Sequence, residues 1–189
     1  SVLIELGLPP GLEAEPVLAG IYAAAEDAGL VSDAIMATTG AQREALWALR
    51  EMIPVANRRI GAVASHDISL PLSEIAAFLP RAQAAVRSIY PFRINVFGHL
   101  GDGNLHYNIF PPAGEDRAGH AGRAEAVTRA VHDFVHDHGG SVSAEHGIGR
   151  LKAGELVRYA DPAKLMAMRA IKQALDPQGI LNPGAVLAV

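Results

Sequence analysis

The central part of the chain alternates apolar and polar residues over short stretches, as strands with one buried face do. These stretches are separated by longer segments with helical apolar spacing. From residue 61 to residue 144 the pattern predicts strand, helix, strand, strand, helix, strand. The predicted strands are 61–69, 93–100, 105–110 and 141–144, and the predicted helices are 72–89, with a kink or break at Pro80, and 123–138.

This order is the split βαβ arrangement of ferredoxin-like sandwiches. It predicts an α+β fold in which an antiparallel-rich sheet has helices packed on one face and leaves the other face open. Because the sequence starts with Ser1 at the beginning of a predicted strand, we expect the chain to be a fragment of a larger polypeptide. Outside the central region, strands are predicted at 2–6 and 31–37 and helices at 12–28, 42–52 and 162–175.

The stretch FGHLGDGNLHYN places two histidines on either side of an Asp-Gly pair. Asp-Gly between apolar runs favours a two-residue type I′ hairpin turn, in which both central residues have positive φ. With Asp102 and Gly103 at the centre, His99 pairs with His106 and shares its face of the sheet. Asn108, two residues beyond His106, points to the same face. The spacing therefore predicts that His99, His106 and Asn108 converge on one patch.

A second cluster, SAEHGIGR, begins in the last predicted strand of the central region. Two histidines and a carboxylate with an open fourth position form a typical catalytic zinc site, so Glu145 could complete His99 and His106. His146 would then be free to act as a general base. Neighbours on a regular strand face opposite ways, and Gly147 would let the backbone leave the sheet so that both serve one site. The alternative, a loop with a structural Glu and a solvated His, stays open.

His132, His136 and His138 form a third group, near the C-terminus of the predicted helix 123–138. His132 and His136 are four residues apart, a spacing that metal sites on helices use. Histidines at a helix C-terminus also gain from the helix dipole while facing water. We therefore interpret this group as a solvated helix end.

Composition narrows the class of partner. The 189 residues carry a formal net charge of −4 and no block of Lys or Arg, which argues against nucleic acid and anionic membranes. No apolar run approaches the length of a transmembrane segment, and no Gly-rich nucleotide-binding motif opens a helix. The absence of cysteine removes disulfides, thiolate nucleophiles and Cys-based zinc sites, and it fits a cytoplasmic location.

Three segments taken together are more specific than these patterns: GHLGDGNLHYN (98–108), SAEHGIGRLK (143–152) and LDPQGILNPG (175–184). They resemble the C-terminal cap domain of FAD-linked oxidases of the vanillyl-alcohol-oxidase type, in the branch of D-2-hydroxyglutarate, D-lactate and glycolate dehydrogenases. LWALRE (46–51) and HDISLP (66–71) also resemble this branch, so the likeness covers nearly the whole chain.

The resemblance implies that residues 1–189 are a substrate- and metal-binding cap, with FAD bound mainly by an N-terminal domain that this chain lacks. It implies oxidation of a D-2-hydroxyacid to a 2-oxoacid, with an electron acceptor such as an electron-transfer flavoprotein or a quinone; a homodimer is left open. The implied metal is Zn²⁺, with Mn²⁺ as the alternative. The implied roles are metal binding for His99, His106 and Glu145, general base for His146, and substrate binding for Arg50 and Asn108.

Two positions depart from the pattern of hydroxyglutarate-specific members. Such members tend to carry Lys two residues before the Asp that matches Asp67, where this chain has Ser65. They also carry Thr four residues after the Arg that matches Arg50, where this chain has Pro54. Both side chains would serve a second substrate carboxylate, so the identity of the 2-hydroxyacid stays open. A stand-alone zinc hydrolase and a non-catalytic metal-binding module stay open as alternative functions.

Overall fold

The computed structural model describes residues 1–187, and the chain divides into two compact units, Ser1–Arg59 and a second that starts at Ile60. No helix within the described residues is long and apolar enough to cross a membrane. In chain order the elements are α1 (Ala14–Asp27), α2 (Gly40–Ile60), β1 (Ala64–Ser69), α3 (Leu72–Ile89), β2 (Arg93–His99), β3 (Asn104–Phe110), the 3₁₀ helix η1 (Ala118–Arg123), α4 (Ala124–Asp137), α5 (Ala153–Tyr159) and α6 (Pro162–Leu175).

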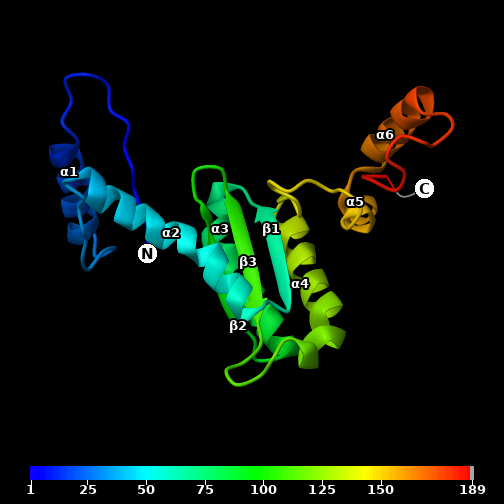
Figure 1. Cartoon of the computed structure of the whole chain (residues 1–189), viewed down its shortest axis with the longest axis horizontal. Helices are drawn as coiled ribbons and strands as arrows, with labels where there is room; N and C mark the ends of the chain where they lie inside the picture. Colours follow the sequence, from blue (N-terminus) through cyan, green and yellow to red (C-terminus); the bar gives the residue numbers. More distant parts are fainter. Residues whose placement is uncertain (188–189) are drawn as a thin grey trace. The chain divides into compact units, whose positions relative to one another are not determined.

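The second unit is built on a three-stranded antiparallel sheet in the order β1-β3-β2, which confirms the predicted α+β class (Figure 1). The fourth predicted strand, 141–144, is reduced to one bridge between Ser69 and Ser141, at the free edge of β1. The prediction of a full strand there is wrong. The hydroxyl of Ser141 bonds to the carbonyl of Ser143, and that of Ser143 bonds to the carbonyl of Gly147. Such local bonds compete with a strand ladder.

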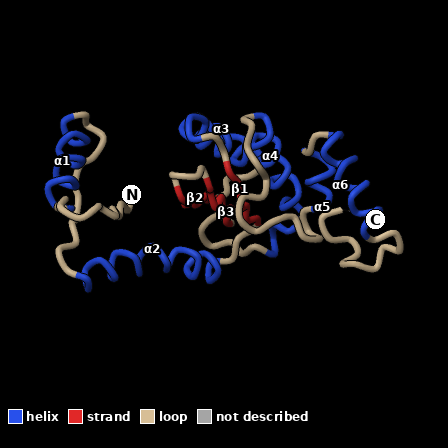
Figure 2. The backbone as a smooth tube through the Cα atoms, turned by 90° about the horizontal axis from the view of Figure 1, so that it is seen from above, coloured by secondary structure: helices blue, strands red, loops and turns tan. Residues whose placement is uncertain are grey.

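One face of the sheet packs against α3 and α4, which lie side by side on the same side of the strands (Figure 2). Ile68, Tyr107 and Ile109 point from the sheet into this core and are fully buried, as are Phe78 of α3 and Val131 of α4. Burying an aliphatic or phenyl side chain of this size contributes roughly 1.5–3 kcal/mol. The apolar face therefore fixes which side of each strand points away from the core.

The two prolines predicted to disturb helices do not interrupt them. Pro80 lies inside α3, where buried Phe78 and Ala82 hold the helix against the core on either side of it. Pro54 lies inside α2, so the predicted end of this helix at residue 52 is wrong. None of the residues of α2 is buried, and packing gives no reason for its continuation.

The first unit lacks the strands predicted at 2–6 and 31–37; both segments are irregular. A strand needs a paired neighbour for its backbone groups. The first segment is instead held by side chains, because the carboxylate of Glu5 accepts hydrogen bonds from Arg43 and from the indole of Trp47. These two predictions are wrong, whereas the helices predicted at 12–28 and 162–175 correspond to α1 and α6.

Candidate functional site

The face of the sheet opposite the core is polar. Asp67 is paired with His106, and His106 with Phe97, so one residue from each strand shares this face. Two residues of this polar face are nevertheless buried: Asp67 is 4% exposed and Asn104 is 2% exposed. The expectation of an open face therefore holds only in part. The residues of this polar face are Ser65, Asp67 and Ser69 on β1, Asn104, His106 and Asn108 on β3, and Asn95, Phe97 and His99 on β2.

The hairpin formed by β2 and β3 brings both predicted histidines to the polar face. His106 lies opposite Phe97, and His99 lies opposite Asn104. The predicted pairing of His99 with His106 is therefore wrong by two residues. Because side chains repeat their direction every two residues, this shift leaves both imidazoles on one face, as predicted.

The connection between the two strands explains the shift. Asp102 accepts a hydrogen bond from the backbone N–H of Asn104 at 2.9 Å, and the carbonyl of Gly103 accepts one from the N–H of Leu70 at 3.1 Å. Gly103 has φ of +74°, whereas Asp102 is not in the left-handed region. The predicted type I′ turn is thus wrong, because the loop bonds to itself and to the end of β1 and stops the ladder at His99.

Glu145 reaches both histidines from a distant part of the chain. Its Oε1 atom lies 3.5 Å from Nδ1 of His99, and its Oε2 atom lies 3.8 Å from Nε2 of His106. The three side chains expected to bind a metal therefore converge. Within residues 1–187, no three His, Asp or Glu side chains already have the arrangement of a metal site, so metal binding by this group stays a prediction.

Asp67 organises the segment that carries Glu145. Its Oδ2 atom accepts hydrogen bonds from the backbone N–H of Glu145 at 2.9 Å and of His146 at 2.8 Å, and Oδ1 accepts one from Nδ2 of Asn104 at 3.1 Å. Burial alone would raise the pKa of Asp67. The two backbone donors, the nearby His146 imidazole and Asn104 outweigh burial and lower that pKa, so the carboxylate is ionised at neutral pH.

His146 lies beside the same group. Its Nδ1 atom is 3.6 Å from Oδ2 of Asp67, and its ring stacks near that of His106 with centroids 6.0 Å apart. The side chain is 67% exposed, so a ring nitrogen is accessible to a substrate. Gly147 has φ of +70°, but the backbone has already left the sheet at Glu145, because Ser141 is the residue of this segment that forms a bridge with β1. Glu145 and His146 can therefore both face the site although they are neighbours.

The two expected substrate-binding residues lie in different units. Asn108 is on the polar face, buried, and its Nδ2 atom donates to the carbonyl of His106 at 3.2 Å. Arg50 lies on α2, in the first unit. The substrate-binding roles of both residues stay predictions.

Sequence reasoning missed Asp67 and Asn104. Both are buried polar residues on strands, and a buried carboxylate is rare unless it is paired or hydrogen-bonded. One sequence signal could have identified Asp67: in the stretch GAVASHDIS it is the charged residue of a predicted strand that is otherwise apolar or uncharged. Its partners are 78 and 79 residues away in the chain, beyond the reach of any local pattern.

The interpretation of the third histidine group as a solvated helix end is wrong for His132. This residue is 3% exposed, and its Nε2 atom lies 3.1 Å from Nδ1 of His66. Its Nδ1 atom lies 2.7 Å from Oε2 of Glu155. His136, four residues later, is exposed, although both rings lie near that of Tyr159, with centroids 6.3 and 5.2 Å away. His132 points inward because it lies on the face of α4 that packs against β1.

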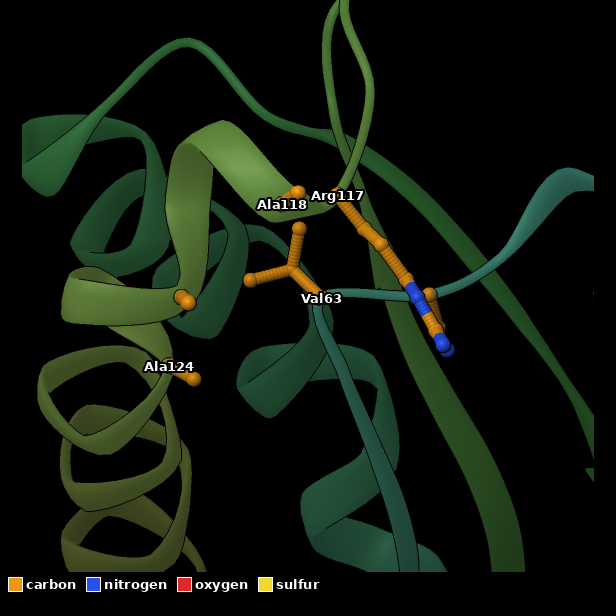
Figure 3. A pocket seen from close by; sticks show the side chains of 6 residues that line it. Val63, Arg117, Ala118 and Ala124 are labelled. Atoms are coloured by element: carbon orange, nitrogen blue, oxygen red, sulfur yellow. The ribbon is translucent and has the colours of Figure 1, made fainter.

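A separate hollow of about 290 Å³ lies where the start of β1 meets η1 and α4 (Figure 3). The side chain of Arg117 extends away from Ala118 and Ala124 (Figure 3). The hollow shares no lining residue with the polar face, and its walls carry no carboxylate or imidazole. The lining residues are Ala62, Val63, Arg117, Ala118, Ala121 and Ala124.

Comparison with known proteins places the chain in a family. The chain matches the family described as "FAD linked oxidases, C-terminal domain" over residues 2–186. It is 39% identical over 167 residues to a D-2-hydroxyglutarate dehydrogenase of Stutzerimonas stutzeri (strain A1501), covering 85% of this chain and 34% of that protein.

Similar relatives come from a plant and an animal. The mitochondrial D-2-hydroxyglutarate dehydrogenase of Arabidopsis thaliana is 38% identical over 159 residues, covering 84% of this chain and 27% of that protein. That of Bos taurus is 37% identical over 187 residues, covering 98% of this chain and 33% of that protein. The chain thus spans about a third or less of the length of these relatives. Since the family match runs through both units and includes every residue of the polar face, the chain belongs to the FAD linked oxidases, as their C-terminal domain.

Proposed function

We propose that this chain is the substrate- and metal-binding part of an FAD-dependent dehydrogenase that oxidises a D-2-hydroxyacid to a 2-oxoacid. The observation that carries the proposal is the convergence of His99 and His106 on Glu145, with His146 beside them. The family match and the names of the relatives support this chemistry over the zinc hydrolase and the non-catalytic module.

By its chemistry, two imidazoles and a carboxylate, the donor set suits a divalent metal, with Zn²⁺ preferred and Mn²⁺ as the alternative. Two neighbouring ligands of a tetrahedral ion at about 2.0–2.2 Å are themselves about 3.3–3.6 Å apart. The separations of 3.5 and 3.8 Å from Glu145 to the two imidazoles are close to that value and too long for direct hydrogen bonds. His99, His106 and Glu145 would hold the ion and leave a position for substrate. A bound divalent ion supplies Lewis-acid chemistry that lowers the pKa of a coordinated hydroxyl.

FAD does not fit the residues of this chain in the same way. Dinucleotide sites cradle the diphosphate on glycine N–H groups between a strand and the N-terminus of a helix. Here the connection from β1 to α3 is Leu70 and Pro71, and the proline has no N–H to offer. We therefore propose that FAD is held mainly by another domain of the enzyme, as the electron acceptor for this site.

The residues of this chain bind the substrate and take its proton. A ring nitrogen of His146 accepts the proton of the α-hydroxyl as general base. Asn108 hydrogen-bonds the substrate from the polar face, and the planar guanidinium of Arg50 binds its carboxylate with two parallel hydrogen bonds.

The substrate class proposed here is a small D-2-hydroxyacid. The relatives are named for D-2-hydroxyglutarate. Ser65 and Pro54 occupy the positions at which hydroxyglutarate-specific members carry Lys and Thr for the second carboxylate of the substrate. The test below therefore includes 2-hydroxyacids with only one carboxylate. The proposed external partner that takes the electrons from the reduced FAD is an electron-transfer flavoprotein or a quinone.

The test uses the full-length enzyme that contains this chain. Its flavin absorbance is followed without oxygen as D-2-hydroxyacids with one and with two carboxylates are added, and its metal content is measured by mass spectrometry. We expect flavin bleaching and about one metal ion per chain. The variants His99→Ala and His106→Ala should lose both, whereas His136→Ala, at an exposed position of α4, should lose neither. A flavin-loaded enzyme that no D-2-hydroxyacid reduces would overturn the proposal.

A further inference from the structure

Asp67 is the most deeply buried charged group of the polar face. It is 4% exposed, whereas the side chains of His99 and Glu145 above it are 55% and 43% exposed. Its hydrogen bonds go to Asn104 and to the backbone of Glu145 and His146. The carboxylate therefore lies beneath the site and holds the segment that carries Glu145 and His146.

The two backbone hydrogen bonds to Asp67 set the path of the chain. In a regular strand the N–H groups of neighbouring residues point in opposite directions. Here the N–H groups of Glu145 and His146 converge on the single atom Oδ2, at 2.9 and 2.8 Å. Ala144 donates to the backbone carbonyl of the same aspartate at 3.2 Å. The segment thus keeps backbone hydrogen bonds to β1 at Ser141 and Ala144, and it turns away from β1 where the carboxylate accepts the next two donors.

The same oxygen also faces the imidazole of His146. The distance from Oδ2 to Nδ1 is 3.6 Å, and catalytic hydrogen bonds are often this long before substrate binds. A carboxylate beside Nδ1 favours the tautomer with the proton on Nδ1, which leaves Nε2 free to accept a proton.

We propose that Asp67 is the positioning residue of this site: it fixes the backbone of Glu145 and His146 and selects the ring orientation in which Nε2 of His146 faces the substrate. The proposal rests on the proposed function for its second part. Its first part, the anchoring of the backbone, concerns the fold alone and can be tested without turnover.

Substitution by asparagine separates the two parts. An amide oxygen at position 67 can accept the same two backbone donors. Its NH₂ group can donate to Oδ1 of Asn104, which is buried and has no partner among the described residues, once that amide rotates. Asp67→Asn should therefore keep the backbone anchored and lose only the negative charge beside His146. Asp67→Ala should lose both.

Asp176 provides a matched control. It is a second buried aspartate that accepts two backbone N–H groups, those of Ile180 and Leu181, both at 2.9 Å. Its remaining side-chain partner is Lys172 of α6. Asp176→Asn therefore measures how the loss of a buried, loop-anchoring carboxylate affects the enzyme when that carboxylate is not beside His146.

The experiment compares these variants in the full-length enzyme. Hydrogen exchange of the peptide covering residues 141–150 should match the wild type in Asp67→Asn and be faster in Asp67→Ala. For the D-2-hydroxyacid that the wild type turns over, Asp67→Asn should lower kcat by about 10–100-fold, the range typical of groups that orient a reacting imidazole. Its KM should stay within about threefold of the wild-type value, and Asp176→Asn should leave kcat unchanged.

Two results would overturn the proposal. A wild-type kcat in Asp67→Asn would exclude the orientation of His146 by the carboxylate. Unchanged exchange of residues 141–150 in Asp67→Ala would exclude the anchoring role. If the wild type oxidises no D-2-hydroxyacid, the proposed function fails, while the exchange result still decides whether Asp67 anchors the segment.

Discussion

His66 and His132 contact each other through ring nitrogens 3.1 Å apart, on the core side of β1. Burial, together with the neighbouring His132 and Lys152, lowers the pKa of His66 to about 3. Burial also lowers the pKa of His132, against the opposing effect of the Glu155 carboxylate. Both imidazoles are therefore neutral in the folded chain at pH values where an unfolded chain protonates them.

This pair makes stability depend on pH. An unfolded histidine titrates near 6.5 and folded His66 near 3, so the unfolded state binds more protons between these values. The free energy of unfolding should fall as pH decreases through that window, by about 1.4 kcal/mol per pH unit for each such proton. Urea denaturation of the 189-residue chain between pH 7 and 4 measures the slope. His66→Asn should flatten it relative to the exposed control His136→Asn; parallel curves would show that His66 protonates equally in both states.

Gly103 should tolerate no side chain. Its φ is +74°, and a Cβ atom there would lie 2.0 Å from the carbonyl oxygen of Leu70. Gly103→Ala should lower the free energy of unfolding by more than about 1 kcal/mol, because the strain of the positive φ and the clash with Leu70 add together. In the same loop, a Cβ at Gly101 meets no atom within 4 Å, so Gly101→Ala should change stability by less than about 0.5 kcal/mol. Equal urea midpoints for the two variants would contradict the described contact between the loop and β1.

Glu145 and His146 should fail in different ways when they are replaced. In the full-length enzyme, Glu145→Gln should lose metal, because a neutral amide is a poor substitute for a carboxylate ligand. His146→Asn should keep its metal and lose turnover by about 10²–10⁴-fold, the usual cost of removing a general base. Metal analysis and stopped-flow reduction of the flavin measure the two effects. If the variants show the opposite pattern, the roles of these neighbours are exchanged.

The 189-residue chain should bind no stoichiometric FAD on its own. Leu70 and Pro71 form the connection where a dinucleotide fold would place its phosphate-binding glycines. The purified chain should be colourless, without the flavin absorbance of the full-length enzyme, after incubation with excess FAD and gel filtration. A yellow protein with one FAD per chain would contradict the proposed division of the enzyme into two binding parts.

Local sequence patterns predicted which residues belong to the site better than they predicted how the strands pair. The period-two repeat of strands was enough to place His99 and His106 on one face, since any even shift of register preserves it. The register itself depends on Gly103 bonding to Leu70, a contact between segments that no turn rule includes. The same limit applies to His132, whose inward direction depends on the packing of α4 rather than on its place near a helix end.

The role of Asp67 was beyond sequence reasoning for a different reason. The chain offers many carboxylates, and only the docking of the segment after Ser141 beside β1 gives this one two backbone donors. Glu145 and His146 were found because glycines and a resemblance marked them. No comparable sequence signal identifies Asp67, because the groups that it binds at Glu145 and His146 are backbone N–H groups, which almost every residue has.

The site is assembled from pieces that form on different scales of chain length. The hairpin that carries His99 and His106 closes a loop of four residues, 100–103, whereas the bond from Glu145 to Asp67 spans 78 residues. Closing the longer loop costs roughly 2–3 kcal/mol more chain entropy. We therefore expect the hairpin half to form early in folding, and the half with His146 to dock late and to detach first. Mild denaturant should abolish turnover while the sheet is still intact, so loss of activity precedes loss of the fold.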